Sequence, residues 1–183
     1  MEIKRRIGLG LHRANDLKRL WRGTGISRKR KIELCDCLIG TKVIYALETL
    51  NTTPDEDISI DAAQFRLYRR ALGYAPPGVA RIKGLEVITN KELQDIVNVK
   101  PWSVRVKLAR VRLLREVHKS PPGEPIRTVL FNEQGNPRHW PGTNIPGNTQ
   151  ARGTWLRTAQ RNEAEIRQIE AQLYSGVPVL GWR

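Results

Sequence analysis

A wide apolar stripe in residues 28–50 constrains the fold more than any other feature of the chain. Apolar side chains recur there at steps of three and four residues, which is the period of an α-helix. They are Ile32, Cys35, Ile39, Val43, Ala46 and Leu50, broadened by Leu34, Leu38, Ile44 and Leu47. Because so wide an apolar arc must be covered on several sides, the stripe predicts a mainly α-helical bundle around a central helix.

Other segments with helical period predict the helices that surround this one. They cover about residues 3–21, the segment 60–74, a short helix that begins near Asn90, and about residues 102–118. Ser27 is a suitable N-cap for the central helix, and Thr89 with Glu92 has the spacing of a capping box. Gly73 suits the C-terminal end of the helix in residues 60–74. The helices together predict a helical bundle.

The last third of the chain predicts a different organisation. Residues 131–153 are rich in Gly, Pro and Asn without helical period, which indicates a long irregular loop. A C-terminal helix is predicted over residues 154–174, and an acidic loop is predicted earlier, at residues 51–57. Three parts follow: a helical domain at 1–119, an irregular linker at 120–153, and a C-terminal helix and tail at 154–183.

The charge of the chain predicts a polyanionic partner. Lys and Arg total 32 against 18 Asp and Glu, so the formal net charge is +14. Basic surfaces concentrate phosphate groups by long-range attraction. Nucleic acid, as RNA, DNA or a hybrid duplex, is therefore the predicted partner, and a solvated basic surface is the alternative.

Arginines gather on one side of two predicted helices. In residues 60–74, three arginines fall within an arc of roughly 100°, opposite aromatic and aliphatic side chains. Residues 102–118 repeat the arrangement. Residues 28–31, RKRK, place four cations at the positive end of a helix dipole, which is easier to understand if an anion lies nearby. The predicted nucleic-acid-binding residues are Arg66, Arg69, Arg70, Arg105, Arg112 and Arg115, with Lys29, Arg30 and Lys31 behind them.

No motif predicts catalysis, a metal site or a cofactor. Cys35 and Cys37 have no second Cys/His pair with ligand spacing, so they are predicted to be free thiols. Asp55, Glu56 and Asp57 are contiguous, and successive side chains need not converge on a metal ion. The phosphate-binding pattern G-x-x-x-x-G-K-[ST] and the pattern G-x-S-x-G do not occur.

The chain also has no pattern that predicts a membrane partner. No apolar segment follows the N-terminal MEIKRR as a signal peptide requires, and no apolar stretch has the length of a membrane span. An intracellular location, nuclear or cytoplasmic, is therefore expected.

A series of landmarks follows the chain in order. They are Arg6-Ile7, Ala14, Leu17, Leu20, Trp21, Ile26-Ser27, Lys31, VIYALETL at 43–50, Asp61, Phe65, Arg69-Arg70, Leu72, Gly73, TNKEL at 89–93, the basic stretch VRLLREVHKSPPGEPIR, and TWLRTA at 154–159. This order resembles the thumb and the region after it in non-LTR (LINE-like) retrotransposon reverse transcriptases. Leu50 stands where that family has an aromatic residue.

The resemblance implies a thumb with a connector that grips the backbone and minor groove of a primer–template duplex. The family's catalytic Tyr/Phe-x-Asp-Asp motif lies upstream in the palm, and this chain has no Asp-Asp pair. The resemblance therefore implies no catalysis by this chain alone. It also predicts three or more helices packed around residues 32–50.

Three alternatives stay open. The chain could supply part of an RNA-directed DNA polymerase that a separate palm-containing polypeptide completes. It could be a truncated relic of a mobile element with no selected function. It could also be an unrelated basic helical protein that binds structured RNA.

Overall fold

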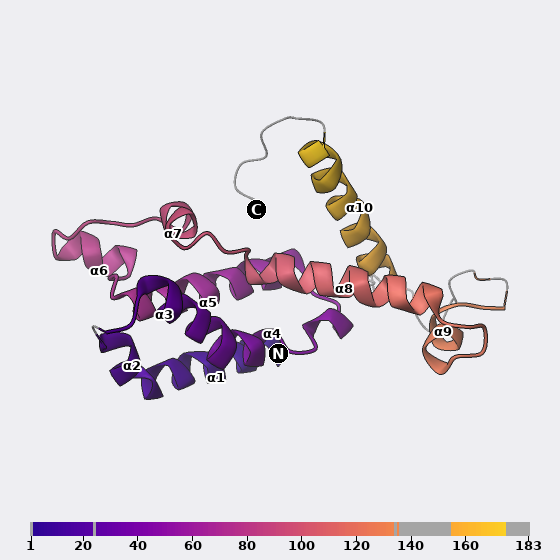
Figure 1. The fold of residues 1–183 in the computed structure, drawn as a ribbon, viewed down its shortest axis with the longest axis horizontal. Helices are drawn as coiled ribbons and strands as arrows, with labels where there is room; N and C mark the ends of the chain where they lie inside the picture. The colour runs from indigo at the N-terminus through magenta and orange to yellow at the C-terminus, as the bar shows by residue number, and fades with distance from the viewer. Residues whose placement is uncertain (1, 24, 134, 136–154, 175–183) are drawn as a thin grey trace, which may run out of the picture. The chain divides into compact units, whose positions relative to one another are not determined.

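The structure, a computed structural model, describes residues 2–23, 25–133, 135 and 155–174 (Figure 1). The regular structure of these residues is helical, without a β-strand, which confirms the prediction of a mainly α fold. The described residues divide into two compact units. The first contains residues 2–45 and 53–105, and the second contains residues 46–52 and 106–174.

Helices of very different length build the first unit. They are α1 (Glu2–Asp16), α2 (Lys18–Arg22), α3 (Arg28–Cys35), the π-helical turn η1 (Asp36–Gly40), α4 (Thr41–Ile44), α5 (Pro54–Leu72), α6 (Pro77–Ile82), α7 (Asn90–Val97) and the first turn of α8 (Trp102–Lys119). Helix α3 packs on α5, and α1 packs on η1, α4 and α5. In Figure 1, α1 and α4 run side by side.

The predicted central stripe is buried, although the segment is not one α-helix. Ile32, Cys35, Ile39 and Val43 are each at most 5% exposed. The helix widens into the π-helical turn η1 and ends at Ile44, so the prediction of a continuous helix to residue 50 is wrong. The chain turns away because Tyr45 is extended and Ala46 has a left-handed φ of 54°.

Gly40 allows a close approach inside this unit. A Cβ atom at Gly40 would lie 2.8 Å from the Trp102 ring, closer than packed atoms tolerate. The indole of Trp102 is fully buried. The first turn of α8 therefore packs against the π-helical turn, and a side chain at residue 40 would push it away.

The N-terminal helix is divided in two. The predicted helix over residues 3–21 is interrupted at Leu17, between α1 and α2. The Trp21 indole Nε1 donates to the Ala14 carbonyl oxygen at 3.0 Å, which holds α2 against the end of α1. Ser27 then caps α3 by accepting from the Arg30 backbone N–H, which confirms the predicted N-cap.

Helix α5 begins earlier than predicted. Residues 54–57, expected in an acidic loop, form its first turn. Thr53 and Glu56 make a capping box, and acidic side chains in a first turn interact favourably with the helix dipole. The predicted end of α5 at Gly73, with a φ of 81°, and the capping box of Thr89 and Glu92 are both confirmed.

The second unit contains the rest of α8, the 3₁₀ turn η2 (Leu47–Thr49), α9 (Pro125–Leu130) and α10 (Trp155–Tyr174). Its apolar cluster is formed by Leu114, Val117, Phe131, Leu156 and Ala159. Helix α10 confirms the predicted C-terminal helix. Most of the predicted loop at 131–153 and the tail after residue 174 lie outside the described residues. The predicted three-part division stays a prediction, because a division by packing does not test which parts fold independently.

Arg110 organises the segment that links η2 to α5. Its guanidinium, fully buried, donates to the carbonyl oxygens of Leu47, Glu48 and Leu50 at 2.8–3.3 Å. It also donates to Asn162 Oδ1 at 2.6 Å and to Thr52 Oγ1 at 3.2 Å. These contacts supply donors for carbonyls outside regular helix, so tertiary hydrogen bonds explain why residues 46–50 leave the helix that their apolar period predicts.

Candidate nucleic-acid interface

The three arginines predicted to share an outward face of α5 differ in exposure. Arg66 is exposed and has no hydrogen-bond or acidic partner among the described residues. Arg70 is exposed and donates to Asn15 Oδ1 at 2.7 Å and to the Leu11 carbonyl oxygen at 3.3 Å. Arg69 is only 6% exposed, so the expectation of a common outward face is wrong for this residue.

Arg69 serves the fold of the first unit. Its guanidinium donates to Asn90 Oδ1 at 2.7 Å and to the Ile88 carbonyl oxygen at 2.9 Å. Burial lowers the pKa of Arg69 from its ordinary value, because desolvation disfavours the charged form. The contacts join α5 to the segment that leads into α7. Replacing Arg69 would therefore disturb the packing of α5 against this segment, rather than remove a contact with a bound partner.

Arg105 points toward a carboxylate of the same unit. Its Nη1 lies 3.0 Å from Asp36 Oδ2 in an ion pair. The other carboxylate oxygen, Asp36 Oδ1, accepts from the Tyr68 hydroxyl at 2.8 Å and from the Trp102 indole at 2.9 Å. Gln64 continues the network, since its amide donates to the Tyr68 hydroxyl oxygen at 2.8 Å.

This Asp36 cluster is a structural centre that the sequence patterns did not predict. Burial raises the pKa of Tyr68 well above its ordinary value, and the neighbouring Asp36 charge raises it further. The phenol therefore stays protonated and donates a hydrogen bond to the carboxylate. The partners of Asp36 lie 32 to 69 residues away from it in sequence, so no local spacing connects them to this carboxylate. The arrangement fixes the start of α8 on η1 and α5 and leaves Arg105 with an internal partner.

In the second unit, the two predicted arginines of α8 are both exposed. Arg112 has no hydrogen-bond or acidic partner among the described residues. Arg115 Nε lies 3.5 Å from Glu163 Oε1 on α10. Arg110, which the patterns did not single out, lies two residues before Arg112 on the same helix and is fully buried. One helix thus contains arginines with opposite environments.

The RKRK segment lies in the first turn of α3, as predicted, and its members also differ. Lys29 is exposed without a partner among the described residues. Arg30 forms an ion pair with Glu33 at 3.0 Å. Lys31 Nζ donates to the Trp21 carbonyl oxygen at 2.7 Å, which joins α3 to the end of α2.

The highest density of unpaired exposed cations is found around the connection from α2 to α3. We name it the cationic turn, and it consists of Lys18, Arg19, Arg22, Arg28, Lys29 and Arg30. All six are exposed, and no acidic residue occurs from residue 17 to residue 32. Within the described part of the chain, only Arg30 has a carboxylate within 4.0 Å. Sequence analysis selected Lys29 and Arg30, noted Arg28 only as part of RKRK, and missed Lys18, Arg19 and Arg22, although the absence of acidic residues was visible in the sequence.

Three members of the cationic turn, Arg28, Lys29 and Arg30, also lie at the positive end of the α3 dipole. Cations there repel each other and the dipole, which costs stability unless an anion is present. No large burial compensates for this arrangement, because the six side chains face solvent. The turn can accept phosphate groups with little loss of internal contacts.

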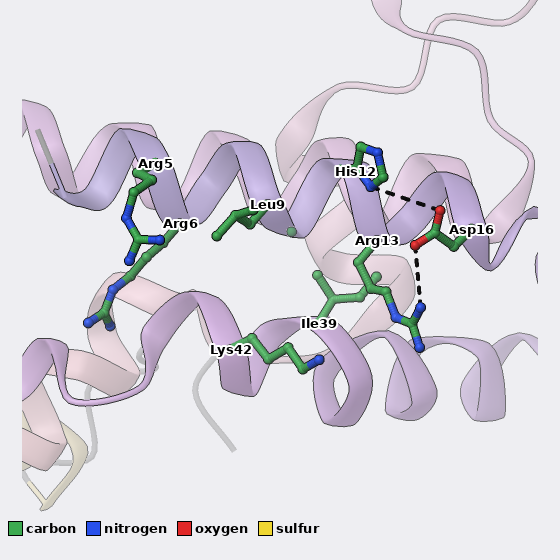
Figure 2. Close-up of a pocket in the computed structure, with 9 residues that line it drawn as sticks. Arg5, Arg6, Leu9, His12, Arg13, Asp16, Ile39 and Lys42 are labelled. Atoms are coloured by element: carbon green, nitrogen blue, oxygen red, sulfur yellow. Dashed lines mark hydrogen bonds and ion pairs between the residues drawn. The ribbon is translucent and has the colours of Figure 1, made fainter.

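A groove of about 420 Å³ lies between α1 and the η1–α4 segment (Figure 2). Most of the ionisable side chains that line it are basic, and Asp16 supplies the one carboxylate of the lining. The lining residues are Arg5, Arg6, Leu9, Gly10, His12, Arg13, Asp16, Ile39 and Lys42. The groove adds a concave basic surface to the same unit as the cationic turn.

The described residues contain no group of three or more His, Cys, Asp or Glu side chains that could hold a metal ion. Cys35 is fully buried, and burial, with a contribution from the Asp36 charge, raises its thiol pKa to about 12. A thiol with this pKa is protonated at neutral pH and is a poor nucleophile. No described helix combines the length and apolar character required to cross a bilayer.

The geometry of the first unit thus provides basic surfaces on the cationic turn and in the groove. Comparison with protein-family models, with curated proteins and with solved structures found no match for the chain.

Proposed function

We propose that the chain is a non-catalytic nucleic-acid-binding module that holds the sugar-phosphate backbone, with the cationic turn as its main contact surface. This is the role implied by its resemblance to the thumb and connector of a retrotransposon reverse transcriptase. The observation that carries the proposal is the cationic turn: six exposed cations with a single carboxylate contact among the described residues.

Unpaired cations are the best candidates for phosphate contacts, because they have no internal hydrogen bond or ion pair to break when they bind. Phosphate contacts from Lys and Arg release counterions, and they position a nucleic acid without reading its sequence. Arg69 and Arg105 would first have to give up internal hydrogen bonds. Among the residues predicted from the sequence, Lys29, Arg66 and Arg112 remain the strongest candidates.

The packing of the first unit supports a thumb-like module over a mixed-sheet RNA-binding protein. Helices α1 and α5 pack against the α3–α4 segment, and Trp102 from the start of α8 lies against Gly40. Three elements therefore surround residues 32–44, as the resemblance predicts for a thumb.

Binding to a labelled RNA–DNA hybrid, followed by fluorescence anisotropy from about 50 to 200 mM salt, tests the proposal. The informative variant replaces four members of the cationic turn, Lys18, Arg19, Arg28 and Lys29, by Gln. We expect this variant to bind hybrids of any sequence more weakly. The salt slope should fall by about 3 to 4, since each lost phosphate contact removes about 0.9.

A second quadruple variant controls for net charge. It replaces Arg81, Lys83, Lys91 and Lys100, which are exposed cations of the same unit, by Gln. If the cationic turn is the interface, this control changes the salt slope by less than about 1. Equal losses in both variants would mean that net charge alone attracts the hybrid. No binding at about 50 mM salt would favour the alternative of a relic with a solvated basic surface.

A primer-extension assay with a separate palm-containing chain addresses the other alternative. A gain in extension upon adding this protein would indicate that it completes a polymerase, and the absence of a gain would leave only the binding role.

A further inference from the structure

The groove between α1 and α4 combines charge with exposed apolar surface. Leu9 lies in its middle, flanked by basic side chains, and is 57% exposed (Figure 2). Arg5 lies toward one end and Arg13 toward the other, with Lys42 on the opposite wall. The groove therefore offers an exposed apolar side chain among basic ones.

An exposed aromatic residue directly follows α4, the helix that supplies Lys42 to the groove. Arg6, a lining residue, donates a hydrogen bond to the Tyr45 carbonyl oxygen, which places the Tyr45 backbone beside the Arg5–Arg6 end. Tyr45 is 74% exposed, and its side chain makes no hydrogen bond or ring contact within the described part of the chain. Its ring is therefore accessible to a planar ligand.

The basic side chains of the groove are available to a ligand. Lys42 is exposed and has no acidic partner among the described residues. Arg5 is bound to Glu2 at 2.7 Å and Arg13 to Asp16 at 3.3 Å, yet their side chains remain 62% and 50% exposed. Exposed single-contact ion pairs contribute little stability, so the Arg13 guanidinium can turn to a phosphate at small cost. Arg5 would have to release two hydrogen bonds to Glu2, at 2.9 and 2.7 Å.

We propose that this groove binds a single-stranded segment of nucleic acid, with an unpaired base stacked on Tyr45 and in contact with Leu9, and with phosphates near Lys42, Arg5 and Arg13. The inference rests on the proposed nucleic-acid-binding function and names a second substrate form for it. Single-strand sites elsewhere combine a basic groove with aromatic side chains on which bases stack.

The geometry favours a single strand over a duplex here. The bases of a duplex are stacked inside it, and its outer surface presents mainly phosphate and sugar. An exposed tyrosine and an exposed leucine gain little from such a surface, whereas an unpaired base offers a free aromatic face to both. The cationic turn consists of Lys and Arg alone, so it offers charge without a stacking surface and suits the backbone of a duplex.

The test measures affinity for three labelled ligands: a uridine decamer, a thymidine decamer and the RNA–DNA hybrid. Tyr45→Ala removes the ring, Tyr45→Phe keeps it, and Ile58→Ala removes an equally exposed apolar side chain of α5 outside the groove. We expect Tyr45→Ala to weaken decamer binding by about 5-fold to 100-fold, the range that alanine substitution of base-stacking residues gives. Tyr45→Phe and Ile58→Ala should stay within about 2-fold of the unmodified protein.

Lys42→Gln gives an independent readout. It should reduce the salt slope for the decamers by about 0.7, the contribution of one phosphate of a single strand, and leave the slope for the hybrid unchanged. Stacking does not use the 2′-hydroxyl, so the loss in Tyr45→Ala should appear with both decamers. A loss confined to the uridine decamer would also support the groove and would assign it to RNA.

Several results would overturn the inference. Decamer affinity that is unchanged in Tyr45→Ala, or equal losses for the decamers and the hybrid, would remove the single-strand site while the proposed binding of the hybrid stands. A protein that binds the hybrid and neither decamer at about 50 mM salt would do the same. Failure to bind any of the three ligands would overturn both proposals.

Discussion

The cationic turn and the interior of the two units use the same residue types in opposite ways. In the turn, six cations face solvent and only one has a carboxylate nearby. In the interior, Arg69 and Arg110 are at most 6% exposed, and their guanidinium groups donate mainly to carbonyl and amide oxygens. Position in the fold, more than residue type, decides which cations remain for a partner.

The physical basis of the difference is the geometry of the guanidinium group. Its planar fork carries five N–H donors, so one arginine can serve several backbone carbonyls that lie outside regular helix. A net charge of +14 therefore overstates the surface available to nucleic acid, because part of that charge holds loops in place. Substitutions of buried arginines should therefore lower stability, and substitutions in the cationic turn should lower the salt dependence of binding.

The largest effect is expected from Arg110→Met. The substitution keeps much of the side-chain volume and leaves the buried oxygens of Leu47, Leu50 and Asn162 without this donor. Removing a donor from buried acceptors is costly, and we expect the free energy of unfolding to fall by about 3–5 kcal/mol. Urea denaturation followed by circular dichroism measures the loss.

Arg110→Lys is the matched variant, since it keeps the charge and removes the fork. It should lose most of the same stability, because one ammonium group cannot reach carbonyl oxygens at several positions. A loss below about 1 kcal/mol for Arg110→Met would show that Arg110 does not organise residues 47–52 as described.

The second effect concerns Arg69, which was predicted to bind nucleic acid and is buried instead. Arg69→Met should lower the free energy of unfolding by about 1–3 kcal/mol, because Asn90 and the Ile88 carbonyl lose a charged donor. Its salt slope for the RNA–DNA hybrid should stay unchanged. A reduced slope with unchanged stability would place Arg69 in the interface and break the comparison.

The secondary structure was largely predictable, because periodic apolar residues and caps are local signals. The stripe of Ile32, Cys35, Ile39 and Val43, the Ser27 cap and the Gly73 terminus are all present. The start of α5 was also available from Thr53 and Glu56, which have the same capping-box spacing as Thr89 and Glu92. Only the second pair was used in the prediction.

What failed depends on residues far apart in the chain. An arc of arginines on one helix cannot show that Asn90 lies over Arg69 or that Asp36 lies beside Arg105. The end of the central helix at Ile44 likewise depends on Arg110, which is more than 60 residues away from Leu47. Charge pattern predicted the presence of a basic surface, and tertiary contacts decided which cations form it.

A smaller effect, on the pH dependence of stability, tests whether water reaches the interior beside Asp36. The structure raises the pKa of the Cys35 thiol from 9.0 to about 12. Below pH 9 the folded and unfolded chains both keep this proton. As the pH rises above 9, the unfolded chain loses it first, so unfolding becomes more favourable until the pH reaches about 12.

Comparison with Cys35→Ala isolates this contribution from other alkaline titrations. Between pH 8 and pH 10 the unmodified protein should lose about 1.4 kcal/mol more stability than the variant, since one unit of pKa difference corresponds to 1.36 kcal/mol. Urea unfolding at the two pH values gives the difference. Parallel pH profiles for the two proteins would mean that water reaches Cys35 and that the interior is less closed than its burial indicates.

The smallest effect on stability should come from Arg28→Gln, and it is the sharpest contrast with Arg69→Met. Arg28 is exposed in the first turn of α3 and has no hydrogen-bond or acidic partner among the described residues. We expect stability to change by less than about 0.5 kcal/mol, and to rise if it changes, because a cation is removed from the positive end of the helix dipole. The salt slope for the hybrid should fall by about 0.9 if Arg28 contacts a phosphate.

The two variants should then give opposite results. Arg69→Met lowers the stability and leaves the salt slope unchanged, whereas Arg28→Gln lowers the salt slope and leaves the stability nearly unchanged. If Arg28→Gln leaves the slope unchanged, Arg28 makes no phosphate contact, and for this pair of arginines the comparison reduces to a difference in burial alone.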